Sequence, residues 1–136
     1  MIQQLTITLP SFKRGYHLIT DLIERELPPL PDKGLVNILI QHTSAAISLN
    51  ENADPSVRYD FETFMNKLVP ENNPSLTHIL EGSDDMPAHL KSSLIGASVN
   101  IPITNHQLNL GTWQGIYLCE FRNSGGCRRL VITIIS

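Results

Sequence analysis

Three histidines in separate segments, His42, His78 and His89, are residues of the type from which proteins build divalent-cation sites. His89 follows Asp85 by four positions, so their side chains share one face if a helix has begun by Asp85. A carboxylate beside a histidine can fix the tautomer that binds a metal, and we also count Asp85 as a catalytic candidate. The set suits a Zn²⁺- or Mg²⁺-like ion with an open coordination position. For His42 the alternative is a core histidine satisfied by a backbone hydrogen bond.

A dense polar run, from Asn50 to Asp54, stands directly before the expected start of a helix at Pro55. Asp54 accounts for capping that helix. Asn50 and Glu51 are therefore left over, and we interpret Glu51 as a general base or a support for metal ligands, and Asn50 as a substrate contact. Turn formation by the asparagines is the alternative.

Glu120 is the last member of an alternating set that includes Ile116 and Leu118 in one predicted strand. A carboxylate at the end of a buried face needs a cation, a metal or a proton. We therefore treat Glu120 as a candidate base or metal support. The alternatives are a solvated strand end or an ion pair with Arg122 or Arg128.

Basic residues are few, but some could bind a small phosphorylated substrate, since guanidinium forks match phosphate oxygens. Lys91 and Arg128 are the substrate-binding candidates, and solvated charges are the alternative. No basic block exceeds the pairs Lys13–Arg14 and Arg128–Arg129, which excludes the clustered charge of a nucleic-acid-binding protein.

The length of 136 residues predicts one domain, residues 1–136, with room for a core. Charged residues make up only 17%, below the usual share of about 25%, which suggests that a partner covers part of the surface. No apolar run approaches the roughly 20 residues of a membrane span. Cys119 and Cys127 lack metal or redox spacing, and no export signal precedes them, so we expect reduced thiols and a cytoplasmic protein.

The elements that must position these residues follow from apolar spacing, Pro and Gly. Period-two or continuous apolar runs predict strands, and spacing of three and four predicts helices. The order β-α-β-α-α-β-β-β favours an α+β domain, a mixed and mostly antiparallel sheet packed by two or three helices. The predicted strands are 2–9, 35–41, 97–103, 113–121 and 128–135, and the predicted helices are 16–27, 55–68 and 84–95, the last ending at Gly96.

Four motifs resemble the YjbQ family, also called the secondary thiamine-phosphate synthase family. They are HTSAA (42–46), NENADP (50–55), EGSDDMPAHLKSS (81–93) and LGTWQGI (110–116), and the resemblance covers essentially the whole chain. It implies an α+β fold with a large mixed sheet, a homotrimer and a thiamine-phosphate synthase activity.

Carried over residue by residue, the resemblance places the motif histidines, acidic positions and Trp-Gln pair of the family on His42, His78, His89, Glu51, Glu120, Trp113 and Gln114. Trp113 could stack on a flat ring of a substrate or fill a sheet face. The expected site is thus spread over three segments, which favours a cleft at or beside a subunit interface.

The reaction that the resemblance implies joins hydroxymethylpyrimidine pyrophosphate to a thiazole phosphate and releases pyrophosphate. The thiazole ring nitrogen displaces pyrophosphate from a methylene carbon, and a divalent metal with Arg128 or Lys91 would stabilise the departing charge. The alternatives are a metal- or metabolite-binding trimer without catalysis, and a metal-dependent hydrolase that uses Glu51 or Glu120 as its base.

Overall fold

The strands of this computed structural model, which describes residues 1–136, form two sheets in which every pairing is antiparallel. The five-stranded sheet has the order β1-β8-β3-β5-β6, and the three-stranded sheet has the order β2-β7-β4. In the five-stranded sheet the strands span Ile2–Thr8 (β1), Arg129–Ile135 (β8), Lys33–Ile40 (β3), Ser98–Thr104 (β5) and Gln107–Leu108 (β6). In the three-stranded sheet they span Gly15–Leu18 (β2), Gln114–Glu120 (β7) and Ala45–Glu51 (β4).

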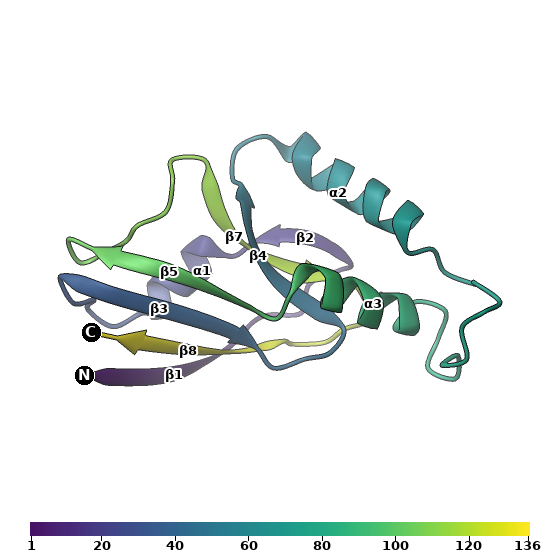
Figure 1. Cartoon of the computed structure of the whole chain (residues 1–136), viewed down its shortest axis with the longest axis horizontal. Helices are drawn as coiled ribbons and strands as arrows, with labels where there is room; N and C mark the ends of the chain where they lie inside the picture. Colours follow the sequence, from purple (N-terminus) through teal and green to yellow (C-terminus); the bar gives the residue numbers. More distant parts are fainter.

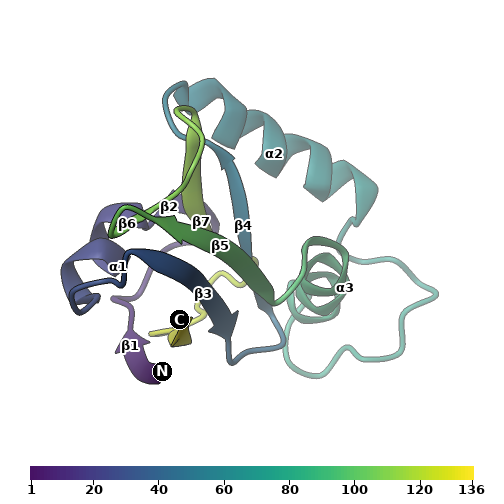
Figure 2. The ribbon, with the colours of Figure 1, turned by 60° about the vertical axis from the view of Figure 1, so that its left-hand side comes forward.

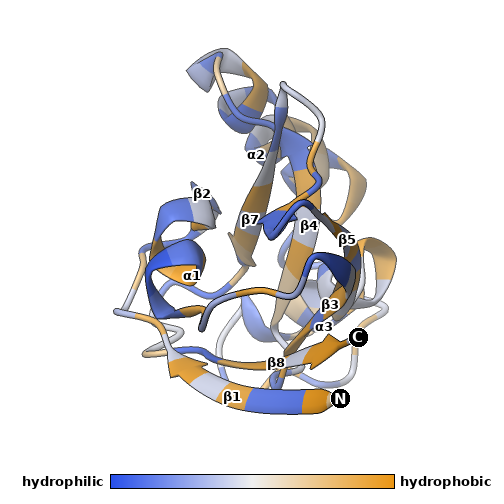
Figure 3. Ribbon diagram, turned by 90° about the vertical axis from the view of Figure 1, so that its left-hand side faces the viewer, coloured by the Kyte–Doolittle hydropathy of each residue, from blue (hydrophilic) through white to orange (hydrophobic).

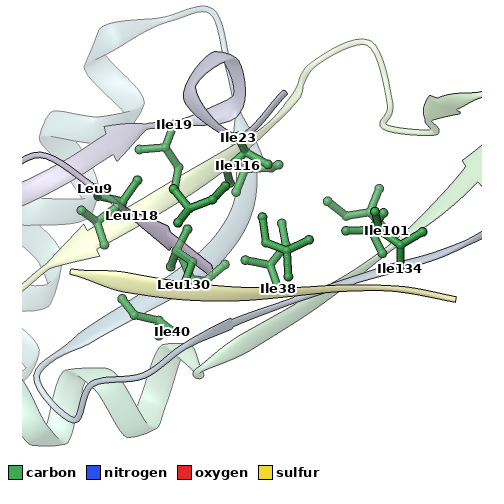
Figure 4. Packing of buried hydrophobic residues seen from close by; sticks show 14 of the residues in the cluster. Leu9, Ile19, Ile23, Ile38, Ile40, Ile101, Ile116, Leu118, Leu130 and Ile134 are labelled. Carbon is green, nitrogen blue, oxygen red and sulfur yellow. The ribbon is translucent and has the colours of Figure 1, made fainter. Parts of the chain in front are cut away.

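The core lies between the two sheets, because alternate residues of their strands point inward. On β3 these are Val36, Ile38 and Ile40, and on β7 they include Ile116 and Leu118, all at most 2% exposed. Figure 4 shows such isoleucine and leucine side chains meeting above β8. Each one buried stabilises the fold by about 1.5–3 kcal/mol relative to an exposed position.

Three helices lie against the three-stranded sheet rather than outside the five-stranded one. Helix α2 packs against β2, α3 against β4, and α1 beside β7, as Figures 1 and 2 show from two sides. The helices span Thr20–Glu26 (α1), Pro55–Leu68 (α2) and Asp85–Ile95 (α3).

Two predicted helix ends are confirmed. The carboxylate of Asp54 accepts the N–H of Ser56 at 2.9 Å and caps α2. Gly96 follows the last residue of α3 with a φ of 111°, a conformation that glycine adopts without strain. The side chain of Asp84, in contrast, makes no capping hydrogen bond to α3, and its Oδ2 accepts a hydrogen bond from Arg122 instead.

The predicted helix over residues 16–27 is wrong in its first part. Residues Gly15–Leu18 form β2, which pairs with β7, and only Thr20–Glu26 is helical. One edge of β7 would be left unpaired without β2, and the hydrogen bonds gained there outweigh the helical spacing of residues 16–19. Where the chain turns from β2 into α1, Thr20 Oγ1 accepts the N–H of Ile116 at 2.9 Å. A long-range pairing of this kind leaves no signal in periodicity.

Besides β2, two further strands, β4 and β6, were not predicted. The residues of β4 begin with Ala45 and Ala46 and end in polar side chains, so neither a continuous apolar run nor alternation marks them. Strand β6 is short and follows a turn in which Asn105 and His106 have φ values of 52° and 64°, as a tight hairpin requires.

The predicted α+β class, with mostly antiparallel strands and three helices, is confirmed. The strands divide into two sheets rather than forming one large one, because β2 and β4 join β7 and not the other strands. None of the helices has both the length and the apolar content to cross a membrane.

Candidate metal centre

Two histidines and one aspartate converge at the start of α3. The Nε2 atoms of His78 and His89 lie 2.7 and 3.2 Å from the same carboxylate oxygen, Oδ2 of Asp85. One ligand atom from each of the three residues lies within 4.8 Å of the others. Asp85 and His89 meet because they stand four positions apart on α3, as predicted, and the preceding loop brings in His78. These are the donor types and the number that a catalytic metal site uses.

The tautomer of His89 is set by the chain segment after β3. Its Nδ1 donates to the backbone oxygen of Thr43 at 2.8 Å, so the ring hydrogen occupies Nδ1. In the neutral ring, Nε2 then carries a lone pair that faces the carboxylate of Asp85. Two acceptors this close need a proton or a cation between them, and a metal ion meets that need.

Arg122 holds the carboxylate end of this group in place. Its Nη1 donates to Asp85 Oδ1 at 2.6 Å, its Nε donates to Asp84 Oδ2 at 2.9 Å, and its Nη2 donates to the backbone oxygen of Glu81. Burial tends to raise the pKa of Asp85, but the hydrogen bond from His78 and the charge of Arg122 outweigh it and lower that pKa. Asp85 is therefore a carboxylate whose Oδ2 accepts the Nε2 hydrogen of His78, and a metal ion bound by that nitrogen would displace this hydrogen.

A cavity of about 380 Å³ opens beside His78. Its polar lining consists of amides and a hydroxyl, and no lysine or arginine contributes to it. The carboxylate of Glu81 lies near His78, with Oε1 4.0 Å from His78 Nε2 and its side chain 65% exposed. The lining residues besides His78 are Asn72, Asn73, Pro74, Leu76, Ile79, Gly82, Ser83, Met86 and Pro87.

His42 is the one predicted metal ligand that lies outside the group. The N–H of Arg129 donates to His42 Nε2 at 2.9 Å, which occupies that lone pair and leaves the ring hydrogen on Nδ1. In this geometry His42 has no lone pair for a metal, and Asp85 supplies the third ligand atom in its place. Burial and the charges of Arg128 and Arg129 lower the pKa of His42.

Glu120 and Arg128, predicted as a base and a substrate contact, form a buried ion pair, one of the alternatives above. The carboxylate is fully buried and accepts from Nε and Nη2 of Arg128 at 2.8 and 2.6 Å. The same Nη2 donates to the backbone and hydroxyl oxygens of Ser44. With these partners both side chains tie β7 to β4 and β8, and they face no open cavity.

Lys91, predicted to bind substrate, is only 1% exposed. Its Nζ donates to Asn66 Oδ1 of α2 at 2.7 Å and lies 5.8 Å from the centre of the Phe121 ring. Burial and the charge of Arg14, which donates to the same Asn66 oxygen, lower the pKa of Lys91. Its ammonium group thus joins α3 to α2 and does not reach solvent.

Asn50 and Glu51 organise the turn between β4 and α2. Asn50 Oδ1 accepts the N–H of Glu51 at 2.8 Å, and Glu51 Oε2 accepts the N–H groups of Ala53 and Asp54, each at 2.8 Å. The hydroxyl of Tyr117 donates to the backbone oxygen of Glu51. The turn-forming alternative accounts for these contacts.

Trp113 and Gln114 stand at that same end of the sheet, because Gln114 pairs with Glu51. Gln114 Oε1 accepts the N–H of Gly111 at 2.8 Å, and the indole of Trp113 is 65% exposed rather than packed on a sheet face. The opposite end of this strand pair lies beside His89. The structure therefore separates the predicted residues into two groups.

Arg122 is the residue whose role sequence reasoning missed, since we considered it only as a partner of Glu120. Adjacent carboxylates at one helix start, Asp84 and Asp85, are the signal that could have found it. Two like charges there require a cation close by.

Comparisons with known proteins agree with this fold. The sequence profile of the family described as UPF0047 protein YjbQ-like matches residues 4–136. The UPF0047 protein YjbQ of Escherichia coli O157:H7 is 47% identical over 136 residues, and that of Salmonella typhimurium is 49% identical, with 98% of each chain covered in both cases. A conserved hypothetical protein of Thermus thermophilus is 32% identical, with a TM-score of 0.83 over 97% of this chain and 99% of that one.

Proposed function

This chain belongs to the YjbQ-like UPF0047 family, and we propose that it is a metal-dependent enzyme whose divalent ion is held by His78, Asp85 and His89. The observation that carries the proposal is the convergence of three ligand atoms within 4.8 Å, with the tautomer of His89 already set by Thr43.

The donor set fits a Zn²⁺-like ion. Tetrahedral bonds of about 2.0–2.1 Å put neighbouring ligand atoms roughly 3.3 Å apart. The two Nε2–Oδ2 distances of 2.7 and 3.2 Å need to open by about 0.6 and 0.1 Å to reach that value, and the widest pair of ligand atoms, within 4.8 Å, needs to close. Three protein ligands leave at least one position for water or substrate.

The proposed reaction is hydrolysis of a small polar substrate bound in the cavity beside His78. A divalent ion at this site would polarise a substrate oxygen and lower the pKa of a bound water. Glu81 is the chain's own candidate base, since its exposed carboxylate stands 4.0 Å from His78 Nε2. We assign the base to Glu81 rather than to Glu51 or Glu120, whose carboxylates are hydrogen-bonded elsewhere. The lack of cations in the cavity favours a neutral or singly charged substrate.

The resemblance supports a second candidate, the thiamine-phosphate synthase-type transfer of hydroxymethylpyrimidine pyrophosphate to a thiazole phosphate. The exposed indole of Trp113 favours it, because a flat heterocycle can stack there. We also infer, from the resemblance and the low charge fraction, that the working form is a homotrimer, and from the free thiols of Cys119 and Cys127 that it is cytoplasmic.

The test is metal content after purification and dialysis, with His78→Ala and His89→Ala beside the unaltered protein. His17→Ala is the matched control, because its Nε2 contacts only the backbone oxygen of Lys13. We expect about one ion per chain in the unaltered and control proteins and at least a tenfold loss in the other two. Full metal content in either ligand variant would refute the assignment.

Activity separates the two reactions. We expect Glu81→Gln to keep the ion but to lose hydrolysis of a panel of esters, amides and phosphate monoesters. Formation of thiamine phosphate from the two heterocycles, at a rate above a blank and lost in His89→Ala, would favour the transfer reaction. If the metal-loaded protein shows neither activity, we would conclude that the chain binds a metal without catalysing either reaction.

A further inference from the structure

The segment between α2 and α3 carries His78 and is fixed to the rest of the chain at few points. It contains no helix or strand, and it extends beyond the ends of both helices in Figures 1 and 2. Over residues 72–81, side-chain hydrogen bonds to other elements come only from His78, which contacts Asp85, and from the backbone oxygen of Glu81, which accepts from Arg122. The place of His78 must therefore depend on how the ends of the segment are held.

Glu71 and Ser83 close the two ends of this segment on each other. Ser83 Oγ donates to Glu71 Oε2 at 3.2 Å, across twelve positions of the chain. Just inside each end stands a residue with a left-handed backbone, Asn72 with a φ of 61° and Gly82 with a φ of 109°, as is typical of turns. We call residues 71–83 the His78 loop, a compact surface loop whose ends meet.

Arg14 holds Glu71 from the segment before β2. Its Nη1 donates to Glu71 Oε1 at 2.6 Å, and its Nη2 donates to Asn66 Oδ1 of α2 at 2.7 Å. The side chains of Arg14 and Glu71 are only 19% and 28% exposed, so this ion pair is partly shielded from water and salt. The carboxylate of Glu71 thus has one oxygen on Arg14 and the other on Ser83.

The same arginine is also connected to the carboxylate side of the metal centre. Arg14 Nη1 donates to Asn123 Oδ1 at 3.4 Å, and the N–H of Asn123 donates to Asp84 Oδ2 at 2.9 Å. Asp84 directly precedes the ligand Asp85. Arg14 therefore links the two parts of the chain that supply the ligands, the His78 loop and the start of α3.

Helix α2 offers an internal comparison, because it shares Arg14 but carries no ligand. Figure 3 shows hydrophilic stretches along α2, which lies at the side of the molecule opposite β1. Glu62 of α2 has its Oε1 3.4 Å from Arg14 Nε and accepts from Asn66 Nδ2 at 3.1 Å. Glu62 and Glu71 are thus two carboxylates on one arginine, of which only Glu71 closes the His78 loop.

We propose that Glu71 is a positioning residue of the metal centre, which closes the His78 loop through Ser83 and is itself held by Arg14. In this way it sets His78 opposite the other two ligands. A loop with free ends would have to become ordered when His78 joins the ion, and that ordering would lower the affinity. The inference rests on the proposed function and names the residues that prepare the site for its ion.

The test compares Glu71→Ala and Ser83→Ala with Glu62→Ala, the matched control that removes the other carboxylate from Arg14. Outer partners of metal ligands change affinity by about 10–100-fold, and we expect the lower end because Glu71 acts through the loop. Competition with a chromophoric chelator should therefore show Zn²⁺ affinity about tenfold lower in Glu71→Ala and Ser83→Ala, and within about twofold of the unaltered protein in Glu62→Ala. Bound Co²⁺ reports the coordination geometry, and its visible absorption should change in the first two variants only.

Two results would overturn the proposal: unchanged affinity and Co²⁺ absorption in Glu71→Ala, or an equal loss in Glu62→Ala, which would indicate a merely structural network. Circular dichroism verifies that the variants fold. If Glu71→Ala unfolds, Ser83→Ala, at an exposed position, carries the test alone.

Proteolysis of the metal-free protein gives a readout that does not depend on the ion. Leu80 is 96% exposed, and chymotrypsin can cut after it only when the loop opens locally. Cleavage there, located by mass spectrometry, should be several-fold faster in Glu71→Ala and Ser83→Ala than in the unaltered protein and Glu62→Ala. If the unaltered protein binds no ion, the proposed function fails, and the cleavage pattern alone decides whether Glu71 closes the loop. If the ion binds and neither affinity nor cleavage changes, the positioning role is wrong and the metal site stands.

Discussion

Removing the charge of Glu120 isolates the contribution of the buried ion pair at the end of β7. Glu120→Gln keeps the shape of the side chain but leaves the guanidinium of Arg128, itself 4% exposed, without a counter-charge. The carboxylate accepts two short bonds from Arg128, at 2.6 and 2.8 Å, and one from the N–H of Arg122 at 3.2 Å, and the amide can keep only those on its one remaining oxygen.

Removing one partner of a buried pair costs about 3–5 kcal/mol, most of it from the uncompensated charge that remains. Urea unfolding followed by circular dichroism, at fixed protein concentration, measures this loss. With an m-value of about 2 kcal/mol/M, the midpoint should fall by roughly 2 M. Glu24→Gln, at an exposed position of α1, is the control and should stay within about 0.5 kcal/mol of the unaltered protein.

The double variant Glu120→Gln with Arg128→Met tests the reasoning most sharply. Replacing both members removes the stranded charge, so the double variant should lose less stability than the sum of the two single variants. Losses that simply add, or a loss under about 1 kcal/mol for Glu120→Gln, would show that the pair is not the structural element described above. Such a result would make a functional role for Glu120 worth testing again.

Three further predictions concern other parts of the chain. Because burial raises the pKa of Cys119 to about 12, alkylation of native protein should modify only the exposed Cys127, with both thiols reacting after unfolding, as mass spectrometry can count. Since the pKa of His42 is lowered by folding, the unfolded state binds more protons below about pH 6.5. Stability should therefore fall as pH drops through this range, and urea midpoints in His42→Gln should fall less. A Cβ on Gly125 would lie 2.2 Å from Glu120 Oε1, so Gly125→Ala should lower the free energy of unfolding by about 1–3 kcal/mol.

Most of the fold was predictable wherever a local pattern agrees with the tertiary structure. The predicted strand 35–41 is a nearly continuous apolar run, broken by Asn37, and it falls on β3, while α2 combines an Asp54 cap with helical spacing. The prediction of helix was wrong for the first part of residues 16–27, because these residues pair as β2 with β7, which lies roughly a hundred residues further along the chain. The prediction missed β4 because its small residues are buried on both faces of the sheet and show no hydrophobic periodicity.

The site was predictable where two residues share one element. Asp85 and His89 meet on α3 by their spacing alone, and His78 joins them from a loop. The exclusion of His42 depends on a hydrogen bond from Arg129, which no spacing rule contains. Histidine ligation is a matter of which lone pair remains free, and that is decided by tertiary contacts.

Because β4 was not predicted, the two groups of candidate residues were expected to form one site. Ala45 pairs with Glu120 at one end of β4, and Gln114 pairs with Glu51 at the other, six residue steps or about 20 Å away. The metal group belongs to the first end, because His89 donates to Thr43 and Ser92 donates to Ala45.

A small substrate that touches the ion cannot also touch the far end of its own chain. Trp113, Gln114, Asn50 and Glu51 can therefore share that substrate only if an assembled neighbour brings its far end over the triad. Within one chain, the proposed chemistry involves only the triad, Glu81 and the cavity beside His78. Any contribution from the far group must disappear when the assembly is broken, while binding of the metal ion persists.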